Sequence, residues 1–314
     1  MRAAVYRGPG IVEWSNWPDP TAGPGEIVLR VRGCGLCGSD IAKIQEGHVA
    51  PPAVFGHEVV GEVVALGAGV TRFEVGDRLV VAHHIPCFSC HYCRRGSPSM
   101  CRSFKEVNLD PGGFAELLRV PAPNVRHASF RVPKSLTDEA ASFTEPLACC
   151  LRAQLLNRAG VRVLASEPLA ARCALGTRFG AEAYREPERL ADAVSEATDG
   201  RGVDLVFVTA GGTGLLASVA PLVRDGGALH YFAGGPGETL PLPLNTLYHR
   251  ELTLTATYST SPAELGEAFE LLVRGKIEVE PLVTHRLPLS QLAEGVKLAL
   301  SRQALKVFLT GATS

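Results

Sequence analysis

Four cysteines lie close together in the segment IPCFSCHYCRRGSPSMC. Cys87, Cys90 and Cys93 are three residues apart, and Cys101 follows eight residues later. Thiolates at this spacing in a short loop can converge on one ion, and four of them complete the tetrahedron that structural zinc prefers. An iron–sulfur cluster is an alternative, although its fourth cysteine is expected after three residues and before a proline. The spacing predicts a structural zinc site, because four unrelated thiols would rarely fall at such regular intervals.

A second set of possible metal ligands comes earlier in the chain. The segment CGLCGSD supplies Cys37 after an expected strand, and VFGHEVV supplies His57 and Glu58 at the start of another. One thiolate, one imidazole and one carboxylate suit a catalytic zinc with an open coordination position. An isolated His–Glu pair is more often a surface or capping feature, so these residues alone leave both interpretations open.

The composition excludes several classes of protein. Apolar residues make up 46% of the 314 residues and charged residues 20%, values typical of a globular protein long enough for two domains. A net charge of −1 gives no reason to expect nucleic acid or an anionic membrane as a partner. No apolar run approaches the ~18 residues of a membrane span, and the first residues lack the apolar core of a signal peptide. The expected location is the cytoplasm, where thiols stay reduced.

The pattern of apolar and polar residues changes near residue 144. Up to residue 143, short apolar runs such as IVLRVRGCG and HEVVGEVVALG are separated by glycine and proline, which predicts a β-rich region. A helix is expected from Thr144, after which the strands VRVLAS, VDLVFVTAG and GALHYFAG alternate with helical segments. Such alternation predicts parallel strands joined by helical crossovers. The chain ends with one helix and one strand, in LSQLAEGVKLALSRQALKVFLTG.

One segment carries a family signature. GHEVVGEVVALGAGV fits GHE-x2-G-x5-G-x2-V at every fixed position. With CGSD and the four cysteines, the chain resembles the zinc-containing medium-chain dehydrogenase/reductases, and among them the alcohol and sorbitol/polyol dehydrogenases. The resemblance implies an α/β protein with a β-rich GroES-like catalytic domain over residues 1–143, to which residues 284–314 return. A shortened Rossmann-like nucleotide-binding domain with a parallel sheet is expected over residues 144–283.

The resemblance also implies roles for the residues of the second set. Cys37 and His57 would bind a catalytic zinc, and Glu58 would be a ligand or exchange with water. Glu145 matches the acidic residue beside the metal in polyol dehydrogenases, where it would be a direct zinc ligand or hold the zinc-bound water. A carboxylate in the first turn of a helix is also favoured by the helix dipole. Ser39 matches the hydroxyl that passes on the substrate proton, and its alternative role is to cap a turn.

Many relatives carry a histidine shortly after this serine. Here Ala42 and Lys43 occupy that neighbourhood, so the outward path of the proton is not predicted. The chemistry itself needs the metal, because an alcohol gives up hydride readily only as an alkoxide, and zinc lowers the pKa of a bound hydroxyl. The hydride then passes to a nicotinamide held close to the reacting carbon.

The segment LLNRAGVRVLASEP looks like the second strand of a dinucleotide-binding unit. It reads as the end of a helix, a turn at Gly160 and a strand that stops at Glu167, where an acidic residue would hold a ribose. In the family, a strand, a glycine-rich turn and a helix precede this point, and the backbone N–H groups of the turn hold the pyrophosphate. Here the helix that contains Glu145 runs directly into LLNRAG, so about 30 residues are expected to be missing, roughly one strand–helix unit.

Other residues of the expected cofactor surface remain. Glu167 matches the ribose-binding acid and Arg172 the basic residue that often follows it, which favours NAD over NADP; the alternative is a solvated pair at a helix start. Gly212-x-Gly214-x-x-Ala217 offers a weak substitute for the pyrophosphate turn. Losing two charge-assisted hydrogen bonds would weaken cofactor binding on the order of a hundredfold or more. Without the first strand, VRVLAS is predicted to pair directly with VDLVFVT in a five-stranded sheet.

Two functions follow from these residues. The first is a zinc-dependent oxidoreductase with two zinc ions per chain, which transfers hydride from an alcohol or polyol to NAD with impaired cofactor affinity. The alternative is a zinc-binding protein on the same scaffold that binds a small molecule or another subunit without redox turnover. Because relatives form dimers or tetramers, a homo-oligomer is expected.

Overall fold

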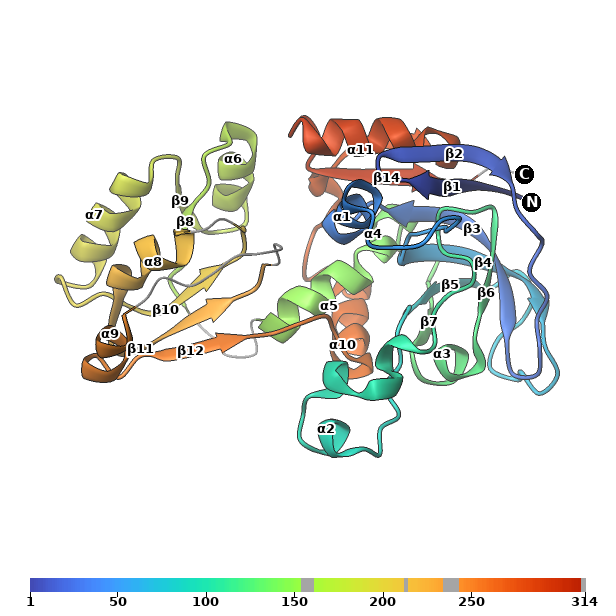
Figure 1. The fold of residues 1–314 in the computed structure, drawn as a ribbon, viewed down its shortest axis with the longest axis horizontal. Coiled ribbons are helices and arrows are strands. Elements are labelled where there is room, and N and C mark those ends of the chain that lie inside the picture. Colours follow the sequence, from blue (N-terminus) through green and yellow to red (C-terminus); the bar gives the residue numbers. More distant parts are fainter. Residues whose placement is uncertain (154–160, 212–213, 234–242, 312–314) are drawn as a thin grey trace. The chain divides into compact units, whose positions relative to one another are not determined.

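The computed structural model describes residues 1–153, 161–211, 214–233 and 243–311, and is drawn in Figure 1. The chain forms two compact units, the first made of residues 1–151 and 259–314 and the second of residues 152–258. The domain limits predicted from the sequence lay at residues 144 and 284. Helix α10 (Pro262–Val273) belongs to the first unit because its apolar residues Phe269 and Leu272 are buried in a core cluster of that unit.

The first unit holds a seven-stranded sheet and a separate β-hairpin. The hairpin strands are β1 (Arg2–Gly8) and β2 (Ile11–Asn16). The sheet strands are β3 (Ile27–Gly35), β4 (Glu58–Leu66), β5 (Arg78–Val81), β6 (Leu117–Val120), β7 (Ser129–Arg131), β13 (Val283–Pro288) and β14 (Lys306–Thr310). The helices are α1 (Gly38–Glu46), α2 (His91–Arg94), α3 (Ala122–His127), α4 (Asp138–Ser142), α5 (Thr144–Ala153), α10 and α11 (Leu292–Leu300).

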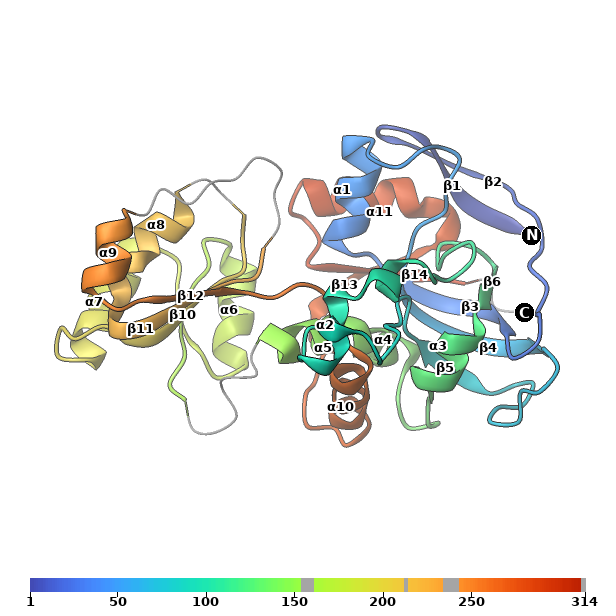
Figure 2. The same cartoon turned by 60° about the horizontal axis from the view of Figure 1, so that its bottom comes forward.

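The sheet of the first unit runs in the order β13-β14-β3-β4-β5-β7, and β6 also pairs with β3. All pairs are antiparallel except β13–β14, so the C-terminal strand lies beside one of the earliest. Helix α4 packs on β3 and β4, and α11 packs on β13 and β14 (Figure 2). Both faces of β3 are therefore largely covered, which explains why its sequence IVLRVRGCG is a nearly continuous apolar run.

The second unit holds two small parallel sheets. Its strands are β8 (Leu164–Ser166), β9 (Glu182–Tyr184), β10 (Val203–Val208), β11 (Val223–Tyr231) and β12 (Thr253–Ala256). Its helices are α6 (Ala170–Arg178), α7 (Pro187–Ala197), α8 (Leu215–Val219) and α9 (Leu244–His249). Strand β8 pairs with β9, and β10-β11-β12 form the other sheet. Parallel strands joined by helices agree with the expected α/β class.

The predicted pairing of VRVLAS with VDLVFVT is wrong. Among the described residues, β8 and β10 lie in different sheets, so the five strands do not form one sheet. Each sheet has its own helical contacts, since α7 packs on β8 and α8 on β10. Helices are about 10 Å wide whereas neighbouring strands are about 4.8 Å apart, so two strands that are each covered by a helix cannot always come close enough to pair. No helix in the described ranges is long and apolar enough to cross a membrane.

Candidate metal centres

The structure brings the four cysteines of the first motif together. The Sγ atoms of Cys87, Cys90, Cys93 and Cys101 all lie within 4.8 Å of one another. Cys90 is the N-cap of α2, and this short helix turns the chain so that the Sγ atoms of Cys90 and Cys93 are 3.5 Å apart. The backbone N–H of Cys87 donates to the Sγ atom of Cys101 at 3.4 Å, which closes the loop. Four converging sulfur atoms have the donor chemistry of a structural zinc site.

The local backbone prepares one of these thiols for a metal. A hydrogen bond from the backbone of Ser89, supported by its hydroxyl, lowers the pKa of Cys87 to about 6. Burial and the neighbouring thiols instead raise the pKa of Cys93 to about 12. Because metals bind the thiolate form, the deprotonated Cys87 is the natural first ligand, and binding the ion must release protons from the others.

Cys37, His57 and Glu58 form a second cluster, whose ligand atoms also lie within 4.8 Å of one another. Cys37 caps the N-terminus of α1, and Glu58 is the first residue of β4. The antiparallel register of β3 and β4 places Glu58 opposite Gly35, two residues before Cys37. The pairing of two strands thus unites ligands that lie twenty residues apart in the sequence. A sulfur, a nitrogen and an oxygen donor suit a catalytic zinc.

Asp40 orients this cluster, a role that the sequence analysis missed. Its carboxylate is fully buried, and Oδ1 lies 3.3 Å from Nδ1 of His57 while Oδ2 accepts from the backbone N–H of Cys37 at 3.3 Å. Although burial opposes charge, the Asp40 carboxylate raises the pKa of His57 well above its usual value. A carboxylate on Nδ1 leaves Nε2 of His57 for a metal ion. A buried acid three residues after a ligand cysteine is the signal that could have revealed it.

Glu58 has a second partner that the sequence analysis also missed. Its side chain is buried and forms an ion pair with Lys306 on β14, the strand that pairs with β3. Burial disfavours the charged lysine, but the Glu58 carboxylate more than offsets this and raises the pKa of Lys306. A side chain at position 35 would collide with the carboxylate, because a Cβ atom there would lie 1.9 Å from Oε2 of Glu58. Gly35 is therefore needed to make room for Glu58.

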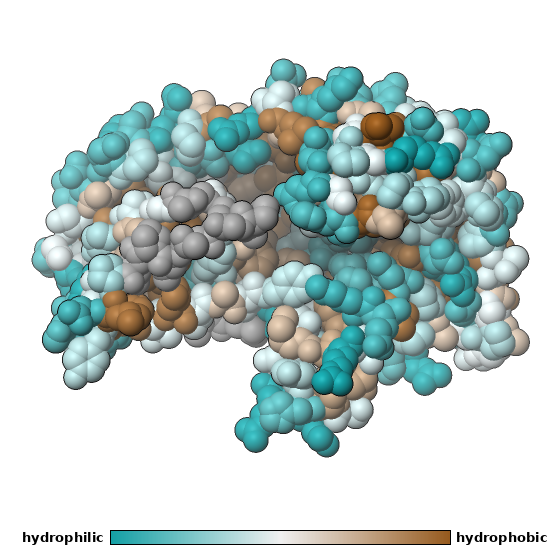
Figure 3. Space-filling model, in the orientation of Figure 1, coloured by the Kyte–Doolittle hydropathy of each residue, from teal (hydrophilic) through white to brown (hydrophobic). Residues whose placement is uncertain are grey.

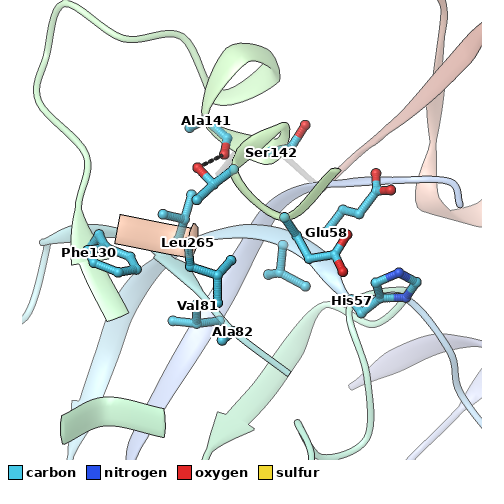
Figure 4. Close-up of a pocket in the computed structure, with 12 residues that line it drawn as sticks. His57, Glu58, Val81, Ala82, Phe130, Ala141, Ser142 and Leu265 are labelled. Carbon is cyan, nitrogen blue, oxygen red and sulfur yellow. Dashed lines mark hydrogen bonds between the residues drawn. The ribbon is translucent and has the colours of Figure 1, made fainter. Parts of the chain in front are cut away.

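Glu145 lies beside the second cluster. It is buried in α5 and lines a pocket together with His57 and Glu58, although its oxygens are outside the 4.8 Å cluster of ligand atoms. Burial and the charge of Glu58 raise the pKa of Glu145, whereas His57 acts in the opposite direction. Figure 4 shows His57 and Glu58 at one end of the pocket and Phe130 at the other, with Val81, Ala82 and Leu265 between them. The pocket thus joins ionisable groups to an apolar wall.

Ser39 is exposed in the first turn of α1, where its hydroxyl donates to Sγ of Cys37 at 3.4 Å. The hydroxyl is consequently within reach of whatever binds beside Cys37. A donor to a metal-binding sulfur can also stabilise the thiolate.

The predicted cofactor residues lie in the second unit. Glu167 directly follows β8, and its Oε1 accepts from the backbone N–H of Leu169 at 2.9 Å. Arg172 is in α6, five residues further on. Gly214 has a φ of 97° and caps the five-residue helix α8, whereas Gly212 falls outside the described residues. The structure places Glu167 at the tip of a parallel strand, the position from which a ribose-binding acid acts.

Comparison with known proteins agrees with this geometry. Residues 23–130 match the family described as alcohol dehydrogenase GroES-like domain, and residues 150–274 match the zinc-binding dehydrogenase family. L-threonine 3-dehydrogenase of Pyrococcus horikoshii is 31% identical over 304 aligned positions that cover 85% of each chain. The chain belongs to the zinc-containing medium-chain dehydrogenase/reductases. Membership in this enzyme family confirms the predicted GroES-like and Rossmann-like architecture.

Two other medium-chain dehydrogenase/reductases match almost the whole chain. Sorbitol dehydrogenase of Halalkalibacterium halodurans is 30% identical over an alignment that covers 99% of each chain. That alignment spans 346 positions and this chain has 314 residues, so at least 32 positions of the relative have no counterpart here. An alcohol dehydrogenase from Thermus sp. ATN1 superposes with a TM-score of 0.86 at 26% identity, covering 99% of this chain and 100% of the other.

Proposed function

We propose that this protein oxidises an alcohol or polyol to a carbonyl compound, with zinc at Cys37, His57 and Glu58 and with NAD as the hydride acceptor. The observation that carries the proposal is the convergence of these three ligand atoms within 4.8 Å, beside a pocket that His57 and Glu58 line and that reaches an apolar wall. Zinc held there would acidify a substrate hydroxyl, as it lowers the pKa of bound water to about 7. The four cysteines around Cys87 would hold a second, structural zinc.

Four further residues around the proposed zinc site would have separate roles in the reaction. Asp40 holds the imidazole of His57 in one orientation through the 3.3 Å contact with Nδ1. Lys306 neutralises Glu58, so that Glu58 can either approach the metal or remain in its ion pair. Glu145, whose pKa is raised by burial, can hold a proton close to His57. The exposed hydroxyl of Ser39 can take the substrate proton towards solvent.

We also propose that the grip on NAD is weak because one strand–helix unit of the nucleotide-binding domain is missing. Two observations support this: the separation of β8 from β10, and the 32 or more positions of the sorbitol dehydrogenase that have no counterpart here. Glu167 at the tip of β8 remains available for a ribose, and its charge would repel a 2′-phosphate, which favours NAD over NADP. The pyrophosphate would lack its turn of backbone N–H groups.

The test combines metal analysis, cofactor binding and turnover. We expect about two zinc ions per chain, a dissociation constant for NADH in the upper micromolar or millimolar range by fluorescence titration, and slow oxidation of polyols or L-threonine at millimolar NAD. L-threonine and sorbitol are the substrates named for the relatives, and they differ in charge. Zinc binding without NADH binding or turnover would contradict the proposed oxidation.

That last outcome would instead support the alternative function, a zinc protein that binds a small molecule or a subunit without redox chemistry. The split sheet of the second unit is the observation that favours it. In either case we propose a homo-oligomer, a dimer or tetramer, that acts in the cytoplasm. Among the described residues β8 and β10 each have one unpaired edge, and this supports self-association because unpaired strand edges favour pairing with another chain. Sedimentation analysis at several concentrations would reveal the oligomer.

A further inference from the structure

Helix α5 supplies a hydrogen-bond donor to the buried carboxylate of Glu145. The Sγ atom of Cys149 lies 3.4 Å from Oε1 of Glu145 and donates to it. The two residues are four positions apart, so their side chains lie on the same face of the helix, about one turn from each other. Among the described residues, no other side chain donates a hydrogen bond to this carboxylate. Cys149 is therefore the side chain that fixes its orientation.

The surroundings of Cys149 suit it to this role. Its side chain is half-buried, and burial, followed by the negative charge of Glu145, raises the pKa of the thiol. The sulfur consequently keeps its proton, so the thiol is the donor and the carboxylate oxygen the acceptor. A thiol is a weak donor, but a hydrogen bond to a charged group still changes an equilibrium by about tenfold. The bond is thus strong enough to decide between two arrangements of Glu145 that are close in free energy.

Two arrangements of Glu145 are possible beside the Cys37 cluster, by which we mean Cys37, His57 and Glu58. Glu145 lines the same pocket as His57 and Glu58, but its oxygens lie outside the set of ligand atoms that converge within 4.8 Å. The carboxylate can move into the cluster as a fourth ligand, or it can stay on the helix, bonded to Cys149 as the structure shows. The second arrangement leaves the open coordination position that a catalytic zinc needs.

We propose that Cys149 is a positioning residue, which holds the carboxylate of Glu145 beside the Cys37 cluster and outside the coordination shell of its metal ion. The inference rests on the proposed function and selects one of the two roles of Glu145, a group that holds a proton near the metal rather than a ligand. Cys149 acts through Glu145 alone. Without the thiol, the carboxylate is free to occupy the position that the alcohol would take.

The visible spectrum of the protein with Co²⁺ in place of zinc tests this inference, because the spectrum depends on the ligands of the ion. Spectra are recorded without NAD or alcohol. In Cys149→Ala the released carboxylate should join the ion, so we expect the visible bands to weaken as the coordination number rises. The affinity for the metal should rise by up to about tenfold. Cys149→Ser, which restores a donor, should behave like the unaltered protein.

Comparison with further variants shows which groups cause the change. The site with four cysteines contributes equally to every spectrum, and the bands of the Cys37 cluster are those that His57→Asn removes. Cys149→Ala combined with Glu145→Gln should lose both effects, because a carboxamide is a poorer metal ligand than a carboxylate. Cys150→Ala removes the exposed neighbouring thiol of the same helix, and as the matched control it should leave spectrum and affinity unchanged.

The possible results separate this inference from the proposed function. An unchanged spectrum and affinity in Cys149→Ala would overturn the inference, and so would a change that persists in the double variant. A lower metal affinity in Cys149→Ala would also overturn it, because Cys149 would then be a ligand itself. If the unaltered protein lacks the bands that His57→Asn should remove, no metal binds at the Cys37 cluster. The proposed function would then fail, and the inference with it.

Discussion

The two units of the chain differ in how completely their strands are paired and covered. The first unit has a continuous sheet and a large core in which Leu29, Leu79, Leu118 and Leu309 are fully buried. In the second unit the core cluster consists of Ala220, Val223 and Leu229 with a few partly buried neighbours. Large apolar side chains stay exposed there, including Leu244 at 79% and Tyr248 at 78%, and Figure 3 shows an apolar surface at α9.

This difference separates the two halves of the proposed reaction. Of the residues that would activate the alcohol, His57 and Glu58 are buried, and each has a partner from a distant part of the chain. The residues that would hold the cofactor lie at the end of the short strand β8 and at the helices α6 and α8, in a unit whose described strands form two separate sheets. Stability follows burial, so the metal site should persist under conditions in which the second unit opens. Hydrogen exchange read by mass spectrometry reports on each unit separately.

Replacing His57 should have the largest effect and should be confined to the first unit. His57→Asn removes the imidazole ligand, so we expect the zinc content to fall from about two ions per chain to about one. Activity should fall by about a thousandfold or more, because the hydroxyl of the substrate would no longer be acidified. Hydrogen exchange in the second unit should not change. His48→Asn, an exposed histidine of the same unit, is the control. An unchanged zinc content would show that the Cys37 cluster is not a metal site.

Lys306→Met should strongly destabilise the first unit. The substitution leaves the carboxylate of Glu58 buried without its partner, and breaking a buried ion pair in this way costs about 3–5 kcal/mol. Denaturant unfolding measures the loss, and the double variant Glu58→Gln with Lys306→Met should recover most of it because the charge is removed as well. If Lys306→Met costs less than about 1 kcal/mol, Glu58 has another counter-charge, and the interpretation of the pair is incorrect.

The two units also differ in how much of their structure could be predicted from the sequence. The clustering of Cys37 and His57 could be predicted because each stands in a short motif beside an apolar strand. The contact of Lys306 with Glu58 could not be predicted in this way. The two residues lie far apart in the sequence and come together only because β14 pairs with β3. The same limit explains the split sheet. Local patterns predict that VRVLAS and VDLVFVT are extended, but the pairing of strands depends on how the helices that cover them fit together.

Adding the strand–helix unit that we propose is missing should strengthen the second unit. Replacing residues 154–160 with a strand, a glycine-rich turn and a helix of the dinucleotide-binding type should join β8 and β10 into one sheet. We expect NADH to bind about a hundredfold more tightly, because two or more charge-assisted hydrogen bonds to the pyrophosphate are regained. An insert of equal length made of glycine and serine is the control. If both inserts leave NADH binding unchanged, the proposed low affinity for the cofactor has another cause.

The smallest expected effect is a pH dependence carried by His84 of the first unit. Burial, the first cause, lowers the pKa of His84 from 6.5 to about 4, so the folded state prefers the neutral ring. The unfolded chain takes up a proton below pH 6.5 and the folded chain does not. The stability that His84 contributes is therefore complete above pH 6.5 and is lost as the pH falls towards 4. Between pH 7.5 and 5.5 the loss is about 1 kcal/mol.

His84→Gln should remove this part of the acid sensitivity. The variant keeps polar atoms at the site but cannot titrate, so its stability should fall by about 1 kcal/mol less than that of the unaltered protein over the same interval. His230 of the second unit also has a pKa lowered by burial, and hydrogen exchange should show that its unit remains equally sensitive to acid in the variant. The half-buried His285 on β13, changed to Gln, is the control. Equal losses of stability in His84→Gln and the unaltered protein would mean that His84 can be protonated in the folded chain, and that the imidazoles beside His57 are more open to water than their burial indicates.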